Sequence, residues 1–527
     1  MTDDTRTESG PYARGLAGGV AAGAVTIGVA ELLAGVLSRG GWAGGTPSPV
    51  LAVGGAFIDR TPPWLKDFAV NVFGTHDKQV LLTGITVVLV LLSLLVGALL
   101  VRRVVAALVL FVLLLAVAAA AVLSRPHAAP QDLVPIVIGG LAGLWTLSAW
   151  RRRFVSVATG EHALAPGSVV DRRTVLGATT GAIVGGALAT VVGRAISGSA
   201  RAVQQARAAF MVPKVAHPVT VPAGASVGVR GVTPFIVPSG EFYRIDTALV
   251  VPQVDPDQWH LRVTGMVERE VTLDWHTLLA KPMQEAMVTL MCVSNEVGGD
   301  LNGNAIWTGW PVRDLLAEAG VKPGADMVLS TSVDGWTAGT PLSALTDGRN
   351  ALIAVAMNGK ALSAVHGFPA RLVVPGLYGY VSATKWVTQL KVTTYSSDEG
   401  YWTPRGWSAK GPVKTSSRID VPRNGAHVTP AANGKVAVAG VAWAQHRGIK
   451  AVQVRIDDGE WQQARLGTDA SIDAWRQWVL EWKAPSKGRH TVTVRAIDRT
   501  GAVQSSAQAP PAPNGSSGYD SVTVTVT

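Results

Sequence analysis

Long apolar runs dominate the first two hundred residues of the chain, whereas short alternating segments dominate the rest. Four runs without a charged residue are each close to the ~20 residues that a helix needs to cross a hydrocarbon core. A fifth, rich in Gly and Ala, contains Glu31, and small residues suit close helix packing. The pattern predicts an N-terminal α-helical transmembrane bundle over residues 1–197, with spans at about 15–37, 80–101, 104–123, 133–150 and 175–193.

Clusters of arginine between these runs predict the orientation of the helices. Arg102–Arg103 lies between the second and third runs, and Arg151–Arg153 and Arg172–Arg173 lie between the fourth and fifth. Positive clusters of this kind remain on the cytoplasmic side. The N-terminus is therefore expected on the cytoplasmic side of the membrane, and everything after about residue 197 on the extracytoplasmic side. Arg172–Arg173 before a weakly hydrophobic span is also typical of a twin-arginine export signal, and both interpretations stay open.

Polar residues of the helical region raise two further questions. Glu31 is either a proton-linked site or a carboxyl group beside a packed polar neighbour. The loop over residues 38–78 either caps the helices or touches the domain that follows. Haem is not predicted, because bis-histidine ligation needs histidines within the spans, and those of this region, His76, His127 and His162, fall in loops. A cytochrome function is therefore excluded.

The pattern changes after the fifth run. Residues 198–232 are polar, punctuated by Val, Pro and Gly and without a clear helical period, which indicates a linker. Over 233–398, strand-like runs such as ALIAVAM alternate with short helical patterns such as VRDLLAEAG, which predicts a mixed α+β domain. Over 399–527, alternating strands separated by turn residues predict a β-sandwich of about a hundred residues.

Composition supports a membrane-embedded first part and excludes a nucleic-acid partner. Of the 527 residues, 48% are hydrophobic and 16% charged, and the mean hydropathy is +0.28. The net charge is +10, but residues 1–200 carry 15 Lys and Arg against 10 Asp and Glu. Half of the excess therefore flanks the apolar runs, as membrane topology requires, and is not gathered in a phosphate-binding patch.

A single cysteine, Cys292, stands between an apolar run and a loop rich in Gly and Asn. Since there is no second cysteine, an intramolecular disulfide is excluded. A lone buried cysteine often acts as a small hydrophobe, and that interpretation stays open. Alternatively, its thiolate binds a soft metal beside a loop whose glycines let the backbone approach a ligand. Because no Cys or His lies at metal-ligand spacing, such a metal would bring most of its ligands in an organic cofactor.

The segment CVSNEVGGDLNGNAIWTGWPVRDLL, which begins at Cys292, is similar to the molybdenum-binding segment of the sulfite oxidase family. PSGEFYRIDTALVVPQVDPDQWHLRVTG, MNGKALSAVHGFPARLVVPGLYGY and SATKW resemble segments that form the pterin pocket of this family. GVAWAQHRGIKAVQVRIDDGEWQQARL resembles its immunoglobulin-like dimerisation domain. The resemblance covers about residues 233–527. It implies a molybdopterin-binding domain over 233–398 and an immunoglobulin-like domain over 399–527.

Several matched positions surround the implied metal. The resemblance makes Cys292 the molybdenum ligand, places Tyr243 at the pterin and makes Arg244 a substrate-side or pterin-side arginine. Where the family has an active-site tyrosine, this chain has Trp336, which has no hydroxyl to hold an oxyanion or pass a proton. Ile245-Asp246 follows Arg244 in place of the family's Asn-His, which removes a pterin hydrogen-bond partner or shifts it elsewhere.

Other matched positions belong to the pterin and its phosphate. His366 and Arg371, in HGFPAR, match residues that bind the pterin and the phosphate, and Lys385 matches the segment that closes over the phosphate. A phosphate suits bidentate pairing with Arg and the point charge of Lys, whereas a neutral His can hydrogen-bond the pterin. The further cofactor-binding positions are Ser332, Ser382 and Thr384.

The implied function is that of a membrane-anchored, molybdenum cofactor-dependent oxidoreductase, which transfers oxygen atoms outside the cytoplasmic membrane. Sulfite or a related oxyanion would be the donor. Trp336 and Ile245-Asp246, the two departures from the family pattern, count against sulfite itself as the substrate. A sulfoxide or N-oxide reductase, fed by membrane electron carriers, is therefore an alternative. A cofactor-free cell-surface interaction protein is the alternative of another class. The chain shows no counterpart of the haem-binding domain of animal sulfite oxidases, so a separate redox partner is expected, such as a cytochrome or a quinone-linked protein. A homodimer through the sandwich is also expected.

Overall fold

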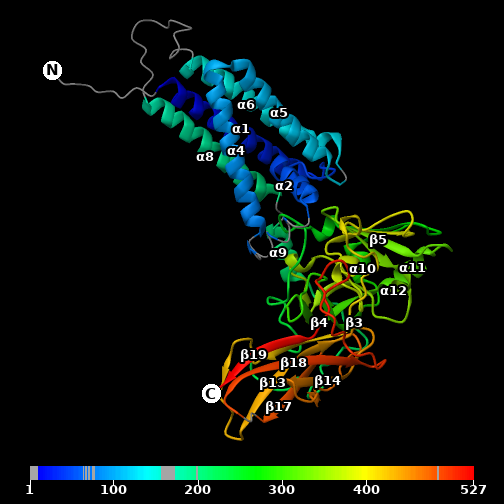
Figure 1. Cartoon of the computed structure of the whole chain (residues 1–527). Coiled ribbons are helices and arrows are strands. Elements are labelled where there is room, and N and C mark those ends of the chain that lie inside the picture. The colour runs from blue at the N-terminus through cyan, green and yellow to red at the C-terminus, as the bar shows by residue number, and fades with distance from the viewer. Residues whose placement is uncertain are drawn as a thin grey trace. The chain divides into compact units, whose positions relative to one another are not determined.

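The chain forms two compact units, residues 1–201 and 202–527, each described by itself. The computed structural model describes residues 10–62, 65, 68, 72, 73, 77–126, 128–155, 172–197, 200–483 and 486–527. Figure 1 shows helices in the first unit and strands with short helices in the second. The described residues do not include the histidines of the helical region, His76, His127 and His162. They also do not include the residues directly before Arg172 in the candidate export signal.

The first unit is helical throughout its described elements. These are α1 (Pro11–Arg39), α2 (Pro49–Arg60), α4 (Asp77–Arg102), α5 (Val104–Leu123), η2 (Pro130–Leu133), α6 (Val134–Trp150), η3 (Arg151–Val155) and α8 (Arg172–Ser197). Within the described residues, five helices are long and apolar enough to cross a membrane: Pro11–Arg39, Lys78–Arg102, Val104–Leu123, Pro130–Val155 and Arg173–Ile196. They contain the five predicted spans.

Small residues bring α1 into backbone contact with its neighbours. A Cβ atom added to Gly28 would lie 2.6 Å from the Cα of Gly186 in α8, and one added to Gly19 would lie 2.0 Å from the carbonyl oxygen of Ser93 in α4. Any larger residue at these positions would force the helices apart, which explains why the first run is so rich in Gly and Ala. Helix α1 therefore packs against α4, α6 and α8 (Figure 1).

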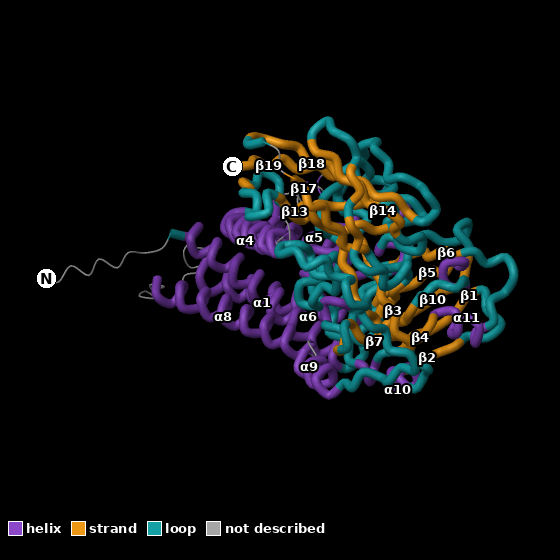
Figure 2. The backbone as a smooth tube through the Cα atoms, turned by 90° about the horizontal axis from the view of Figure 1, so that it is seen from below, coloured by secondary structure: helices purple, strands orange, loops and turns teal. Residues whose placement is uncertain are grey.

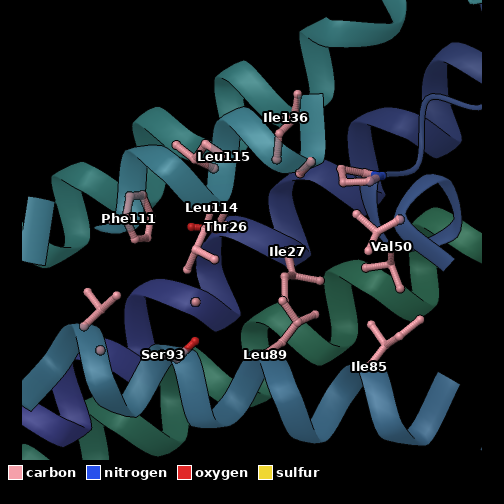
Figure 3. Close-up of a pocket in the computed structure, with 16 residues that line it drawn as sticks. Thr26, Ile27, Val50, Ile85, Leu89, Ser93, Phe111, Leu114, Leu115 and Ile136 are labelled. Carbon is pink, nitrogen blue, oxygen red and sulfur yellow. The ribbon is translucent and has the colours of Figure 1, made fainter. Parts of the chain in front are cut away.

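A cavity of about 110 Å³ lies between α1, α2, α4, α5 and α6 (Figure 3). Its walls are apolar apart from the hydroxyl groups of Thr26 and Ser93. Thr26 donates its hydroxyl proton to the carbonyl of Ala22 in its own helix (2.7 Å). The cavity therefore offers apolar surface and no ionisable side chain, and it is unsuited to charged substrates.

Glu31 is buried, at 2% exposure, and has polar neighbours on two sides. The hydroxyl of Ser48 donates to its Oε1 (2.6 Å), and Arg194 of α8 lies 3.7 Å from its Oε2. Of the two interpretations left open, the packed polar neighbour is the one that the structure contains. Ser48 also caps α2 by accepting from the Leu51 N–H. Helix α2 packs on α5 within the first unit, so this part of the loop over 38–78 caps the helices.

The α+β domain of the second unit contains two sheets (Figure 2). The first has the order β2-β1-β10-β5-β6 and the second the order β3-β4-β7-β8, with β9 paired to β7. The strands are β1 (His260–Gly265), β2 (Val271–Asp274), β3 (Gln284–Met291), β4 (Asn302–Pro311), β5 (Met327–Ser332), β6 (Thr337–Pro341), β7 (Leu352–Met357), β8 (Lys360–Ala361), β9 (Arg371–Val373) and β10 (Val387–Thr393). The predicted run ALIAVAM contains β7.

Short helices precede, connect and follow these strands. They are η4 (Pro256–Gln258), α10 (Trp275–Leu279), α11 (Val312–Ala319), α12 (Leu342–Thr346), η5 (Ala364–His366), α13 (Gly379–Ser382) and η6 (Thr403–Arg405). The predicted helical pattern VRDLLAEAG forms α11, which ends at Gly320 with φ +71°, a conformation that favours glycine. The central strand β7 is buried along its whole length, and its continuous apolar sequence reflects burial on both faces.

Two further sheets enclose a separate hydrophobic core over residues 416–526. Their orders are β11-β13-β17-β16 and β12-β19-β18-β14-β15. The strands are β11 (Ser416–Val421), β12 (His427–Val428), β13 (Lys435–Trp443), β14 (Ile449–Ile456), β15 (Gln462–Gln463), β16 (Arg465–Leu466), β17 (Arg476–Lys483), β18 (Gly488–Asp498) and β19 (Asp520–Val526). Alternating side chains of β18 and β19 are buried, which matches the period of two in their sequences.

The predicted linker over residues 198–232 differs from the expectation in one part. Residues Ala200–Ala209 form helix α9, although no helical period was recognised there. Arg207 of α9 donates from Nε to the carbonyl of Leu362 (2.7 Å), so tertiary contact stabilises a helix whose sequence signal is weak. Farther along, the Val227 N–H donates to Oε1 of Gln477 (2.8 Å), so this part contacts strand β17.

Candidate functional site

Cys292 directly follows β3 and opens the loop that leads into β4. Its backbone N–H donates to the carbonyl of Leu301 (2.9 Å), so the two ends of the loop meet. Asn295, 1% exposed, fixes the loop from inside, because its Oδ1 accepts from the Leu301 N–H (2.7 Å). The thiol is therefore held in a defined place at the end of a buried strand.

The Cys292 side chain is half-buried. Burial raises the pKa of its thiol, whereas hydrogen bonds from Ser294 and the charge of Lys385 act in the opposite direction. Since the thiolate is the form that binds metals, a metal cation at this position would offset the cost of ionising the buried thiol. Among the described residues, no three His, Cys, Asp or Glu side chains gather into a metal site. A metal bound to Cys292 would need ligands from another source.

Residues of the C-terminal sheet region also support the Cys292 loop. Arg418 of β11, 5% exposed, donates from Nη1 to the carbonyl of Gly299 (2.7 Å) and to Oδ1 of Asn302 (3.0 Å). Its Nε pairs with Asp420 (2.7 Å). Ser516 donates its hydroxyl proton to the carbonyl of Asn295 (2.7 Å). The loop is therefore held by residues more than a hundred positions away, none of which the sequence had indicated.

Replacing Arg418 with Met is expected to lower the free energy of unfolding by about 3–5 kcal/mol, because it leaves Asp420 as an unpaired buried charge. Urea denaturation followed by tryptophan fluorescence measures this loss. Arg262→Met is the control, since Arg262 pairs with Glu270 at 3.5 Å on the exposed surface, where a pair contributes about 0–1 kcal/mol. Equal losses in the two variants would contradict a structural role for Arg418.

Arg371 begins β9 as a buried cation, 4% exposed. Its guanidinium donates to three carbonyl groups at 3.3–3.4 Å, those of Leu372, His366 and Ala383, and lies 5.0 Å from the centre of the Trp307 ring. Burial lowers its pKa to about 10. No carboxylate within the described part of the chain lies in ion-pair distance of this guanidinium. Burying a charge without a counter-ion is costly, so this arginine is suited to an anionic ligand.

His366 ends the short helix η5 and is also buried. Its Nε2 lies 2.9 Å from the carbonyl of Ser239, and since a carbonyl only accepts, Nε2 is the donor. Burial and the positive charges of Arg371 and Lys385 lower the pKa of His366 to about 4. The imidazole is therefore neutral near pH 7, and its Nδ1 is an acceptor with no partner among the described residues.

Lys385, Asp246 and Arg244 form one ionic group. Oδ2 of Asp246 lies 3.1 Å from Nζ of Lys385 and 3.1 Å from Nε of Arg244. The Lys385 and Asp246 side chains are 10% and 6% exposed, whereas that of Arg244 is 42% exposed. Burial lowers the pKa of Lys385 to about 8, and the neighbouring Asp246 limits this shift. The predicted positions Arg244 and Lys385 are therefore brought together by the carboxylate of Asp246. From the sequence, Asp246 was expected only to remove or shift a hydrogen-bond partner of the pterin.

Tyr243 is an electrostatic neighbour of both the thiol and the buried guanidinium. Burial raises the pKa of its phenol, as does Cys292, and Arg371 acts in the opposite direction. A Cβ atom added to Gly379 would lie 3.8 Å from its hydroxyl oxygen, so this glycine leaves room for the phenol. Tyr378 has the same electrostatic neighbour, since burial raises its pKa to about 12 with a smaller contribution from Cys292. The motif PGLYGY contains Tyr378, but nothing in the spacing had marked it.

Four further predicted positions divide into two kinds. Thr384 shares a hydrogen bond with Ser330 (2.7 Å), and Ser382 donates to the carbonyl of Tyr378 (2.9 Å). Both hydroxyl groups are thus engaged within the protein. By contrast, Oγ of Ser332 and Nε1 of Trp336 are buried and lack hydrogen-bond partners in the part of the chain that the structure describes.

Trp386 connects the turn over Ser332–Trp336 with the turn that contains His366. The Val333 N–H donates to the carbonyl of Trp386 (2.9 Å), and Nε1 of Trp386 donates to the carbonyl of Ala364 (2.9 Å). Because Lys385 precedes Trp386, these two contacts place Ser332 and Trp336 on the Lys385 side of the site. Neither of them joins Trp336 to Cys292.

Comparison with known proteins places this geometry in a family. Residues 248–402 match the family described as "Oxidoreductase molybdopterin binding domain". The chain is 32% identical over 157 residues to the uncharacterized oxidoreductase YuiH of Bacillus subtilis, a match over 30% of this chain and 76% of that protein. It is 29% identical over 326 residues to mitochondrial sulfite oxidase of Rattus norvegicus, a match over 52% of this chain and 58% of that enzyme.

The chain belongs to the sulfite oxidase family of molybdopterin oxidoreductases. It therefore contains a molybdopterin-binding oxidoreductase domain, as the sequence motifs indicated. The chain spans less than two thirds of the length of the rat enzyme. Among solved structures, it resembles the sulfane dehydrogenase SoxCD from Paracoccus pantotrophus with a TM-score of 0.46 and 23% identity, over 59% of this chain and 87% of that one.

The residues of the site fit the cofactor that family membership implies. Three buried polar atoms, Oγ of Ser332, Nε1 of Trp336 and Nδ1 of His366, lack hydrogen-bond partners in the described residues. Native proteins leave few such atoms, because each costs about 1–3 kcal/mol. Together with the buried guanidinium of Arg371 and the half-buried thiol of Cys292, they form a donor and acceptor set for a ligand that is anionic, hydrogen-bonding and metal-bearing.

Proposed function

We propose that this protein is a membrane-anchored oxidoreductase that binds a molybdopterin cofactor through Cys292 and transfers an oxygen atom to or from a small oxo compound. One observation carries the proposal: the sole thiol and a buried arginine without a carboxylate partner among the described residues share one neighbour, Tyr243, because the charges of both act on the pKa of its phenol. The thiol suits a metal and the arginine suits a phosphate, so both ends of one cofactor have a partner.

Each residue has a distinct role in this proposal. Cys292 supplies the thiolate ligand, Arg371 pairs with the phosphate, and neutral His366 accepts a hydrogen bond at Nδ1. Tyr243 covers the pterin between them, and Arg244 faces the substrate from its more exposed position. The bound cofactor would supply two-electron oxygen-atom transfer. The chain's own residues bind it and orient it.

Two directions of the reaction are compatible with this site. In one, an oxyanion such as sulfite gains an oxygen atom from water, and two protons and two electrons are released to a separate redox protein or quinone-linked carrier. In the other, a sulfoxide or N-oxide takes up two protons and two electrons and releases water. The sulfite oxidases among the relatives favour the first direction, oxidation of an oxyanion. The second is favoured by Trp336, which lacks the hydroxyl group expected at that position.

The proposal also covers the location of the protein in the membrane and the role of its C-terminal sheets. The five long apolar helices support anchoring in the cytoplasmic membrane, and the arginine clusters support a catalytic unit on its extracytoplasmic side. The two sheets over 416–526 are proposed to form an immunoglobulin-like domain that makes a homodimer.

The proposal is tested by the metal content of the purified full-length protein. We expect about one molybdenum per chain after expression in a host that makes the cofactor. Assays with sulfite, dimethyl sulfoxide and trimethylamine N-oxide, each with artificial electron acceptors or donors, then determine direction and substrate. Protein that is folded but free of molybdenum would refute the proposal and leave a cofactor-free interaction protein as the explanation.

A further inference from the structure

Asp246 places a negative charge among the cations of the site. Its Oδ2 is shared by Lys385 and Arg244, each at 3.1 Å, and its side chain is 6% exposed. Because the pair with Lys385 is buried, it is screened far less by water and salt than a surface pair. Any anion that approached Lys385 or Arg244 would have to compete with a carboxylate that is already in contact with both.

The net charge of the site limits which ligands it attracts. The site contains three cations, Arg244, Arg371 and Lys385, and His366 is neutral. The carboxylate of Asp246 offsets one of the three positive charges. A phosphate group carries about 1.5 to 2 negative charges at pH 7, so a bound cofactor would offset most of the remaining two. Little positive charge is then left over to attract an anionic substrate.

We propose that Asp246 is a built-in anion of the substrate pocket, which selects uncharged oxo compounds such as sulfoxides or N-oxides over dianions such as sulfite. This inference rests on the proposed function, since it concerns the substrate of the same site. A neutral substrate does not compete with Asp246 for Lys385 and Arg244, whereas a dianion must displace the carboxylate or lie close to it. Asp246 acts through charge and touches the two cations, so it is a specificity-determining residue.

The test uses Asp246→Asn in the full-length, molybdenum-containing protein. Sulfate serves as an unreactive dianion, and its binding is measured by isothermal titration calorimetry at pH 6, below the pKa of about 8 of Lys385. Removing one unit charge at hydrogen-bond distance from both cations is expected to raise sulfate affinity by at least about tenfold. In steady-state assays, the ratio of kcat/KM for sulfite oxidation to kcat/KM for dimethyl sulfoxide reduction should rise in the same variant.

Two matched variants complete the design. Asp246→Glu keeps the carboxylate and should retain the sulfate affinity of the wild type. Glu318→Gln removes a carboxylate from another lysine, Lys281, at 2.6 Å and outside the site, and should also leave sulfate affinity unchanged. A tenfold gain in Asp246→Asn alone supports the inference.

Other outcomes overturn it in distinguishable ways. Unchanged sulfate affinity in an Asp246→Asn protein that still contains molybdenum would refute the role of Asp246 and leave the proposed function intact. Loss of molybdenum from Asp246→Asn, but not from Asp246→Glu, would assign the carboxylate to cofactor binding instead of substrate choice. Absence of molybdenum from the wild type would refute the proposed function itself.

Discussion

Cys292→Ser should give a folded protein without molybdenum-dependent turnover. The backbone bonds that close the loop, from the Cys292 N–H to Leu301 and from the Asn295 N–H to the Cys292 carbonyl, do not involve the side chain. Serine therefore preserves the loop. Its hydroxyl is a harder and far less readily ionised ligand than a thiol. Loss of a group that merely orients a metal ligand lowers metal affinity or activity by about 10–100-fold, and loss of the ligand itself should lower activity further.

Thiol labelling gives this experiment a second readout. Because Cys292 is the sole cysteine of the chain, a maleimide reports on this position alone. Wild-type protein with molybdenum should react more slowly than the same protein after the cofactor has been removed. Wild-type turnover in Cys292→Ser with molybdenum still bound, or equal labelling rates in the two forms, would contradict the assignment. Circular dichroism of the serine variant should match that of the wild type.

Local patterns account for what could be predicted from the sequence. Apolar runs of about twenty residues depend on a local rule of length and hydropathy, and the five long helices contain the predicted ranges. The strands β13 and β18 likewise lie in runs whose alternation is visible over a few residues, and β7 lies in a short continuous apolar run. Helix α9 has no such signal, and a contact between Arg207 and Leu362, 155 positions apart, accompanies it.

The candidate site was predictable as a set of residues but not as a set of partners. Family motifs pointed to Arg244 and Lys385, yet the carboxylate that joins them lies 139 positions before Lys385 in the chain. Arg418 reaches the Cys292 loop over 119 positions. Such contacts depend on the tertiary fold, and no spacing rule along a single sequence reveals them. The sequence also could not show that Ser382 and Thr384 use their hydroxyl groups internally whereas Ser332 does not.

Arg371→Met should strongly reduce the molybdenum content of the protein without destabilising the cofactor-free chain. Each hydrogen bond to a charged group contributes about 1.5–3 kcal/mol, so losing two to a phosphate should weaken cofactor binding by about a hundredfold or more. In the cofactor-free chain, however, the guanidinium is a buried charge whose partners among the described residues are long bonds to carbonyl groups and the Trp307 ring. Methionine fills similar space without that charge, so the free energy of unfolding should stay within about 1 kcal/mol of the wild type or rise.

Two other arginines make this result interpretable, because they differ from Arg371 in burial and partners. Arg418 is equally buried but already paired with Asp420, so Arg418→Met should destabilise the cofactor-free chain, and any loss of molybdenum should accompany that instability. Arg244 is 42% exposed and paired with Asp246, so Arg244→Ala should retain molybdenum and change substrate kinetics instead. Metal analysis and urea denaturation of the three variants separate these cases. Equal molybdenum loss in Arg371→Met and Arg244→Ala would show that the phosphate and substrate sides of the site are not distinct. A lower free energy of unfolding of the cofactor-free Arg371→Met variant would show instead that the Arg371 guanidinium stabilises the fold.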